Sequence, residues 1–182
     1  MMITRYLFPG LLGACILGIL MTTTPSFDSV FQPIRNTVPG GALAQGRLYD
    51  ARFIGWQTAD QLSFDRYGTT ITRGTQGIFL IVDAAILNAH ESLRLAATWQ
   101  GRSGRYYAQT TRADDAPSTL NTRQFHPGLD DQARAVFELP RDEIAGGTLL
   151  LTRKGLNTLD SELALAPPAG LAQPHHSLLR LE

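Results

Sequence analysis

Beyond its N-terminal quarter, the chain alternates apolar and polar residues in short runs that are separated by turn residues. The strongest run covers 77–88, where Ile78 and Leu80 share one face of a strand and Phe79 and Ile81 share the other. A strand that is apolar on both faces is covered on both sides. The pattern therefore predicts a central, buried strand at 77–88.

Other runs with the two-residue period of a strand follow the same rule. We predict them at 48–56, 61–64, 69–72, 93–99, 105–110, 133–139, 148–153 and 159–166. Turns are expected at Asp65–Gly68, Gly101–Gly104 and His126–Gly128, and Pro140 is expected to end the run before it. About eight strands in roughly 120 residues, with no long helix, are typical of a β-sandwich.

The N-terminal residues carry a different pattern. Arg5 precedes an apolar run from Tyr6 to Met21, which three threonines extend to Thr24. As a helix this segment is about 28 Å long, close to the roughly 30 Å of a bilayer core. The favoured prediction is an uncleaved anchor whose N-terminus faces the cytoplasm, because Arg5 lies on the short side.

Two other fates of this segment stay open. A cleaved signal peptide would use Ala42-Leu43-Ala44, about 20 residues beyond the apolar run. A lipoprotein would use Cys15, since Leu12-Gly13-Ala14-Cys15 is similar to a lipid-attachment motif. All three fates place residues 45 onward outside the cytoplasm.

The sequence divides into four predicted parts. Residues 1–24 are the signal-anchor or transmembrane segment, and 25–45 are a linker containing Pro and Gly. Residues 46–166 form the predicted sandwich domain. After Pro167-Pro168 we expect 167–182 to be a flexible tail.

Composition narrows the function classes. The formal net charge is zero, so nothing indicates the phosphate neutralisation that nucleic-acid binding needs. The single cysteine, Cys15, lies in the N-terminal segment. The predicted domain therefore has no intrachain disulfide and no thiolate metal site.

No catalytic constellation emerges from the motifs. Ser103 lies in Gly101–Gly104, which lacks the spacing of a nucleophile elbow and falls in a predicted hairpin. His90, His126 and the pair His175-His176 are separated, and we interpret them as surface residues. We expect no catalytic, cofactor-binding or metal-binding residues.

Some acidic and aromatic residues leave alternatives open. Asp114-Asp115 and Asp130-Asp131 would bind calcium only if their loops met. Asp83, on the predicted buried strand, either pairs with an arginine or lies at an exposed strand end. At least one of Trp56 and Trp99 is expected in the core. Tyr106 and Tyr107 are adjacent, so one of them is expected to be exposed, as at an interface.

Several motifs together resemble a known family. They are Gly77–Asp83 running on to Ile86-Leu87-Asn88, then His126–Leu129, Ala135–Pro140 and Leu149–Leu151. In this order they resemble a bacterial immunoglobulin-like family of extracytoplasmic domains of unknown function, sometimes labelled telomeric-repeat-binding-factor-like. The resemblance covers about 47–166. It implies an immunoglobulin-like fold and a place outside the cytoplasm, and it transfers no catalytic residues.

We therefore expect a single-pass membrane protein with an extracytoplasmic immunoglobulin-like domain. Its expected role is that of a non-catalytic interaction or accessory module of the cell envelope, with the membrane and another envelope protein as partners. The alternative is an extracytoplasmic domain that binds a small ligand, a lipid or an ion.

Overall fold

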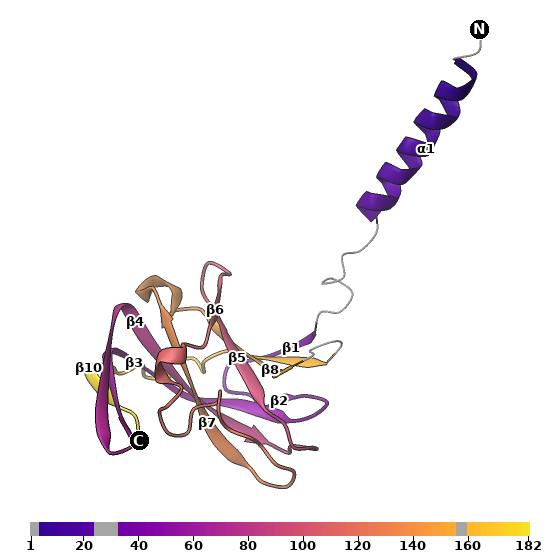
Figure 1. Ribbon diagram of the computed structural model, residues 1–182. Coiled ribbons are helices and arrows are strands. Elements are labelled where there is room, and N and C mark those ends of the chain that lie inside the picture. The colour runs from indigo at the N-terminus through magenta and orange to yellow at the C-terminus, as the bar shows by residue number, and fades with distance from the viewer. Residues whose placement is uncertain (1–3, 24–32, 156–159) are drawn as a thin grey trace. The chain divides into compact units, whose positions relative to one another are not determined.

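The structure, a computed structural model, describes residues 4–23, 33–155 and 160–182 (Figure 1). The chain divides into two units, Met1–Gln32 and Pro33–Glu182. In the first unit, α1 (Thr4–Thr23) contains the apolar run. Near its end the Thr23 hydroxyl donates to the Ile19 carbonyl oxygen at 2.8 Å.

None of the helices in the described ranges combines the length and apolar character required to cross a bilayer. The transmembrane span expected within 1–24 is therefore not supported. Residues 1–3 and 24, which belong to the same predicted segment, lie outside the described residues.

The second unit is a β-sandwich of two sheets, so the predicted all-β class is confirmed at that level. Sheet A has the order β1-β9-β8-β5-β6, with β1 (Ile34–Val38), β9 (Ser161–Leu165), β8 (Thr148–Arg153), β5 (Leu95–Gln100) and β6 (Tyr106–Ala108). Sheet B has the order β10-β3-β4-β7, with β10 (His175–Arg180), β3 (Asp50–Arg66), β4 (Thr69–Leu87) and β7 (Asp131–Leu139). The short β2 (Ala44–Gln45) also pairs with β3, and two 3₁₀ turns, η1 (Thr111–Ala113) and η2 (Arg141–Glu143), lie in the connections.

The main core lies between the sheets around Trp99, which is fully buried. Its indole lies 6.0 Å from that of Trp56 and 6.3 Å from the Phe137 ring, and its Nε1 donates to the Glu143 carbonyl oxygen at 3.0 Å. Gly147 has to be glycine, because a Cβ there would lie 2.5 Å from the Trp99 ring. The prediction that at least one tryptophan is core is confirmed.

Another polar group in the main core is satisfied by the backbone. Tyr49 is 2% exposed, and its hydroxyl donates to the Leu151 carbonyl oxygen at 3.0 Å. Burial raises the pKa of the Tyr49 phenol, since the charged form would lose its hydration. The hydroxyl therefore remains a donor at every physiological pH and ties the residue just before β3 to β8.

The predicted central strand at 77–88 is confirmed as the inner half of β4. Residues 78–82 are all buried, with β3 on one side and β7 on the other. The predicted turn at Gly101–Gly104 connects β5 to β6, Gly128 has a φ of 72° in its predicted turn, and β7 ends before Pro140. Short-range patterns thus located this strand and these turns.

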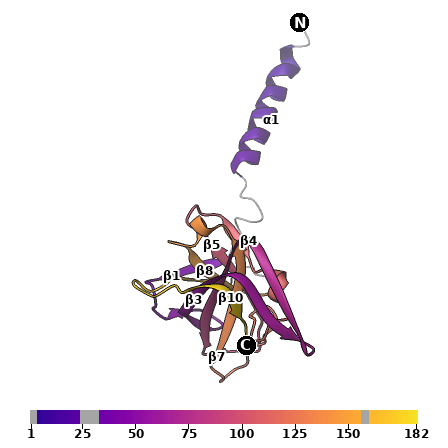
Figure 2. The ribbon, with the colours of Figure 1, turned by 90° about the vertical axis from the view of Figure 1, so that its left-hand side faces the viewer.

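The hairpin of β3 and β4 is much longer than the alternation predicts (Figure 2). The segments predicted as separate strands at 61–64 and 69–72 are its outer half, which we call the arm (residues 61–74). The register shifts between Ala59 and Gln61, where the arm departs from the inner half. Tyr67, with a φ of 49°, and Gly68, with a φ of 79°, form the turn at its tip.

A second core, separate from the first, stabilises the arm. It gathers side chains from the arm, from β4 and β7, from the η1 region and from the C-terminus; the buried members are Ala59, Leu62, Phe64, Phe79, Ile81, Ala113, Ala116, Val136 and Leu181. Part of the segment between the predicted strands at 105–110 and 133–139 is thus packed, with a 3₁₀ turn at η1.

The C-terminal prediction is wrong. In place of a flexible tail at 167–182, β10 pairs in parallel with β3, and both views show it alongside that strand (Figure 1, Figure 2). Leu181 is only 2% exposed, and its amide donates to the Ser63 carbonyl oxygen at 2.8 Å. Burial of one leucine in the second core and the strand ladder outweigh the polar residues around it.

The linker boundary is wrong as well. Residues 33–45, predicted as linker, supply β1, which pairs in parallel with β9, and β2, which pairs with β3. Ala44 is fully buried in the main core. Since β1 has only five residues and carries polar Arg35 and Asn36, no alternation marked it as a strand. The rest of the predicted linker, 25–32, lies outside the described residues.

Candidate functional site

The surroundings of Ser103 indicate a structural role for this residue. It lies in the β5–β6 hairpin, where its amide donates to Glu143 Oε2 at 3.0 Å. Glu143 is 5% exposed, and hydrogen bonds from the Ser103 hydroxyl and amide lower the pKa of its carboxyl group. A Cβ at Gly101 would collide with this carboxylate, so the hairpin sequence fits the buried glutamate closely. The arrangement fastens the hairpin to η2.

The histidines lie in three separate places. His90 Nδ1 is 3.0 Å from the Arg47 carbonyl oxygen, and His126 Nδ1 is 3.0 Å from Ser92 Oγ. His175, at the start of β10, has Nε2 3.3 Å from Asp60 Oδ2. In the residues that the structure describes, no three His, Cys, Asp or Glu side chains form a metal-binding group.

The two aspartate pairs each bind partners of their own. Asn121 Nδ2 donates to Asp114 Oδ1 at 2.7 Å, and Arg66 pairs with Asp115 at 3.2 Å. Arg123 makes two bonds to Asp131, at 2.6 and 2.7 Å. The acids therefore serve to fasten separate loops.

Asp83 pairs with an arginine, which was the first of the two alternatives for this residue. It lies opposite Arg134 in the β4–β7 ladder, and Arg134 Nε donates to its Oδ1 at 2.9 Å. Both side chains are about a quarter exposed, at 28% for Asp83 and 22% for Arg134. The pair stabilises adjacent strands and leaves the role of Asp83 structural.

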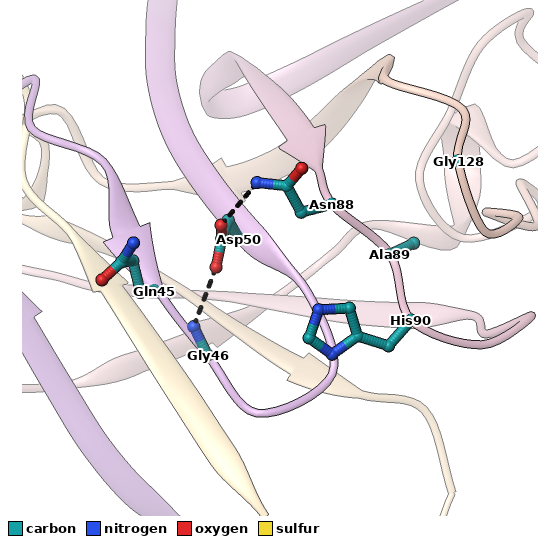
Figure 3. Close-up of a pocket in the computed structure, with 7 residues that line it drawn as sticks. All are labelled: Gln45, Gly46, Asp50, Asn88, Ala89, His90 and Gly128. Atoms are coloured by element: carbon teal, nitrogen blue, oxygen red, sulfur yellow. Dashed lines mark hydrogen bonds between the residues drawn. The ribbon is translucent and has the colours of Figure 1, made fainter.

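One end of the sandwich carries an open cleft of about 540 Å³ (Figure 3). Its lining combines the end of β2, the start of β3, the end of β4 and the turn at Gly128; the lining residues are Gln45, Gly46, Asp50, Asn88, Ala89, His90 and Gly128. Asn88 has a φ of 49°, which asparagine tolerates better than most residues. That conformation turns the chain out of β4 at the cleft.

Hydrogen bonds within the cleft hold its polar groups in place. Asp50 Oδ2 accepts from Asn88 Nδ2 at 2.8 Å, and Asp50 Oδ1 accepts from the Gly46 amide at 3.3 Å. The Asn88 amide donates to Asp130 Oδ1 at 3.3 Å. The lining therefore offers carboxylate, amide and imidazole groups for hydrogen bonding.

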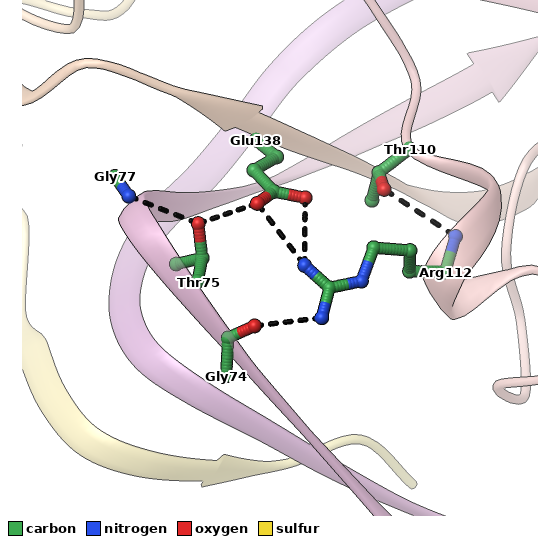
Figure 4. Close-up of polar contacts among 6 residues, drawn as sticks. All are labelled: Gly74, Thr75, Gly77, Thr110, Arg112 and Glu138. Carbon is green, nitrogen blue, oxygen red and sulfur yellow. Dashed lines mark hydrogen bonds and ion pairs between the residues drawn. The ribbon is translucent and has the colours of Figure 1, made fainter.

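A second polar cluster joins the η1 region to the arm (Figure 4). Arg112 donates to both carboxylate oxygens of Glu138 at 3.1 Å and to the Gly74 carbonyl oxygen at 2.7 Å. The Thr75 hydroxyl donates to Glu138 Oε1 at 2.5 Å. The Arg112 guanidinium also lies 5.7 Å from the Phe79 ring centre. Because these groups satisfy one another, the cluster acts as a clamp on the second core.

The outer face of sheet A presents a different cluster, in which Arg35 and Tyr106 are exposed and Glu162 and Gln100 are partly buried. Arg35 on β1 pairs with Glu162 on β9 at 2.5 Å and donates to Gln100 Oε1 on β5 at 3.2 Å. Gln100 Nε2 donates to the Tyr106 hydroxyl on β6 at 3.3 Å. The pKa of the Arg35 guanidinium is raised, chiefly by side-chain hydrogen bonding with Tyr106. The four side chains form a row across the sheet.

The prediction that one residue of the Tyr106–Tyr107 pair is exposed is confirmed. Tyr106 is 59% exposed, whereas Tyr107 packs against the main core. Sequence reasoning missed Arg35, because it lies in the segment expected to be linker. Only the pairing of β1 with β9 brings Arg35 level with Glu162, and no local signal in the sequence indicates that pairing.

Comparisons with known proteins add a fold likeness. No family model and no curated protein matches the chain. Solved structures that resemble it include an uncharacterised β-sandwich protein from Clostridium difficile 630 (9% identity, TM-score 0.44, covering 79% of this chain and all of that one). A conserved hypothetical protein from Bacillus anthracis is similar at 10% identity and a TM-score of 0.45, over 67% of this chain and 93% of that one.

The yjhA protein from Bacillus subtilis is similar at 11% identity and a TM-score of 0.49, over 70% of this chain and 99% of that one. All three TM-scores lie below 0.5, so these likenesses carry no argument about function. The β-sandwich description of this chain rests on its own strand pairing.

Proposed function

We propose that the chain is a non-catalytic interaction module that works outside the cytoplasm as an accessory of the cell envelope. In this proposal it binds another envelope protein through the outer face of sheet A. Residues 1–24 direct the sandwich out of the cytoplasm.

We infer an immunoglobulin-like arrangement of the sandwich from its strand order. In an immunoglobulin domain, strands A, B and E share one sheet, and G, F and C share the other, which a C′ strand extends in variable-type domains. Taking β3 as strand A, the order β3-β4-β7 corresponds to A-B-E, and β9-β8-β5-β6 corresponds to G-F-C-C′. Trp99 on β5 then takes the position of the buried tryptophan on strand C. These correspondences support the family resemblance.

The apolar character of α1 supports the proposed location. Fractionation and intact-mass measurement of the native protein distinguish the three fates of the segment. A full-length mass indicates the uncleaved form, and a lipid-modified Cys15 at a new N-terminus indicates a lipoprotein. Loss of residues 1–44 indicates a signal peptide and contradicts the proposed binding face, because it removes β1 together with Arg35. Recovery of the intact chain in the cytosol contradicts the proposal.

One observation carries the proposed role, namely the row formed by Arg35, Glu162, Gln100 and Tyr106 on a regular sheet. Tyrosine and arginine are the residue types enriched among those that dominate binding energy at protein interfaces. Here they are exposed but held by hydrogen bonds, so little side-chain freedom is lost on binding.

The test is a quantitative pull-down of the tagged full chain from the membrane fraction of its native cells. Tyr106→Ala is expected to reduce recovery of the bound protein at least about tenfold, in the range of a binding hot spot. Leu129→Ser is the matched control, since Leu129 is 64% exposed in the turn before β7. No reproducible partner, or equal recovery with Tyr106→Ala and the wild type, contradicts the proposal.

A second candidate function is supported by the cleft in Figure 3, where the bonded Asp50–Asn88 pair lies beside His90. Such a site suits a small polar ligand or an ion. A thermal-shift screen of metabolites and ions tests it, with His90→Ala expected to abolish any shift that the cleft produces. The absence of any shift, or a shift that His90→Ala leaves unchanged, contradicts it.

A further inference from the structure

The tip of the arm combines an exposed aromatic side chain with an unfavourable backbone conformation. Tyr67 is 95% exposed, and its φ of 49° lies in the left-handed region. Tight hairpin turns with positive φ at both central positions favour Asn-Gly or Asp-Gly. A tyrosine in the first of these positions is an outlier, and such outliers cluster at functional positions.

The Tyr67 ring is contacted by a neighbouring guanidinium group. The Arg66 guanidinium lies 5.5 Å from the centre of the Tyr67 ring. Arg66 is held in turn by Asp115, at 3.2 Å, from the segment that follows η1. The tip is therefore linked through Arg66 to a second element of the fold.

The arm beneath the tip is also fixed. Phe64 and Leu62 are 1% exposed in the second core, and β10 adds a third strand along the β3 side of the arm. Arg180 of β10 pairs with Asp65 at 2.7 Å, next to the tip residues. A rigid support of this kind lowers the entropy lost when a side chain at its end is bound.

The charges around the arm favour a protein partner over a lipid surface. Arg66, Arg112 and Arg180 pair with Asp115, Glu138 and Asp65, respectively. The arm also carries the exposed Arg73, and Glu182, which lies 3.8 Å from Arg180, offsets it. Four arginines thus face four carboxylates, which leaves no excess of positive charge to attract anionic headgroups. One tyrosine alone also provides little area for insertion into a membrane, whereas a single buried tyrosine is a common anchor in a protein pocket.

We propose that the arm tip is a protein-docking element, in which Tyr67 inserts into an apolar pocket of a partner protein and Arg66 binds acceptors at the rim of that pocket. The proposal rests on the proposed function in requiring a partner outside the cytoplasm. It adds a contact site on the arm, independent of the Tyr106 face on sheet A.

Two measurements on the full chain test the proposal. First, Tyr67→Asn relieves the turn and is expected to raise Tm by about 2 °C. A lower Tm would show that the ring is retained for the stability of the arm, which would overturn the proposal.

Second, p-benzoylphenylalanine at position 67, irradiated in native cells, is expected to give one discrete adduct with a different protein. The same probe at Thr72, exposed on the same arm, is the control and is expected to give none. The adduct is expected to persist in a Tyr106→Ala background, which separates this contact from the sheet A face. No adduct, equal adducts from both positions, an adduct with lipid or with a second copy, or loss of the adduct in the Tyr106→Ala background would overturn the proposal.

Discussion

The two cores of the sandwich unit differ in how they are built. The main core consists of long apolar side chains that alternate along regular strands, with Trp99, Phe137 and Leu80 at its centre. The second core is smaller and draws on alanines of the η1 region and on Leu181, near the end of the chain. Its integrity depends on polar fastenings, above all the clamp between Arg112 and Glu138. Regular alternation thus builds the sandwich, and side-chain clamps hold the arm.

The largest effect is expected from Trp99→Ala in the main core. The substitution removes a fully buried side chain, both aromatic contacts and the bond from Nε1 to Glu143. We expect the free energy of unfolding to fall by about 3–5 kcal/mol. Urea denaturation followed by circular dichroism measures it. A fall below about 1 kcal/mol would show that Trp99 does not organise the sandwich.

Leu181→Ala tests whether the second core is stabilised separately from the main core. Removing this buried side chain is expected to lower the free energy of opening of the arm by about 2–3 kcal/mol. The sandwich strands should keep their protection, because Leu181 packs only in the second core. Native-state hydrogen exchange resolves the two regions. Equal loss of protection in β5 and β8 would contradict the separation of the cores.

Arg112→Ala is expected to have a smaller effect. The Arg112 side chain is 42% exposed, so solvent screens its ion pair, and we expect a loss of about 1 kcal/mol. Arg112→Lys is the matched variant, because lysine keeps the charge but cannot bind both oxygens of Glu138 and the Gly74 carbonyl together. Recovery of full stability with lysine, measured by thermal unfolding, would show that charge alone matters.

The smallest expected effect is the pH dependence of Glu143→Gln. The pKa of the Glu143 carboxyl is lowered in the folded state, so its contribution is present above the ordinary glutamate value of about 4.3 and is lost as the pH falls below it. We expect the Tm difference between wild type and variant to be full at pH 7 and to shrink below about pH 4. A difference that is independent of pH would contradict the charged hydrogen bond to Ser103.

Sequence reasoning succeeded where a strand carries its own pattern. The run at 77–88 and the turn at Gly101–Gly104 were located because the alternation and the glycines are local signals. It failed where a segment gains its structure only from a distant partner. β1 and β10 are short, polar strands that pair in parallel with β9 and β3, and nothing within them indicates those registers.

The sequence likewise predicted one part of the sheet A row and missed another. The exposure of one residue of the Tyr106–Tyr107 pair follows from alternation alone, so this half of the sheet A row was accessible from the sequence. Its other half was not, since Arg35 reaches Glu162 only through the β1–β9 pairing. The cleft at Asp50 and Asn88 likewise forms from the ends of different strands.

Hydrogen exchange of the wild-type chain, read residue by residue, tests most directly whether the C-terminus completes the arm. The account predicts slow exchange of the Leu181 amide, which donates to Ser63, together with protection of the arm residues that pair in β3 and β4. Exchange of residues 175–181 at the rate of a free peptide, with the β5 and β8 amides still protected, would contradict it.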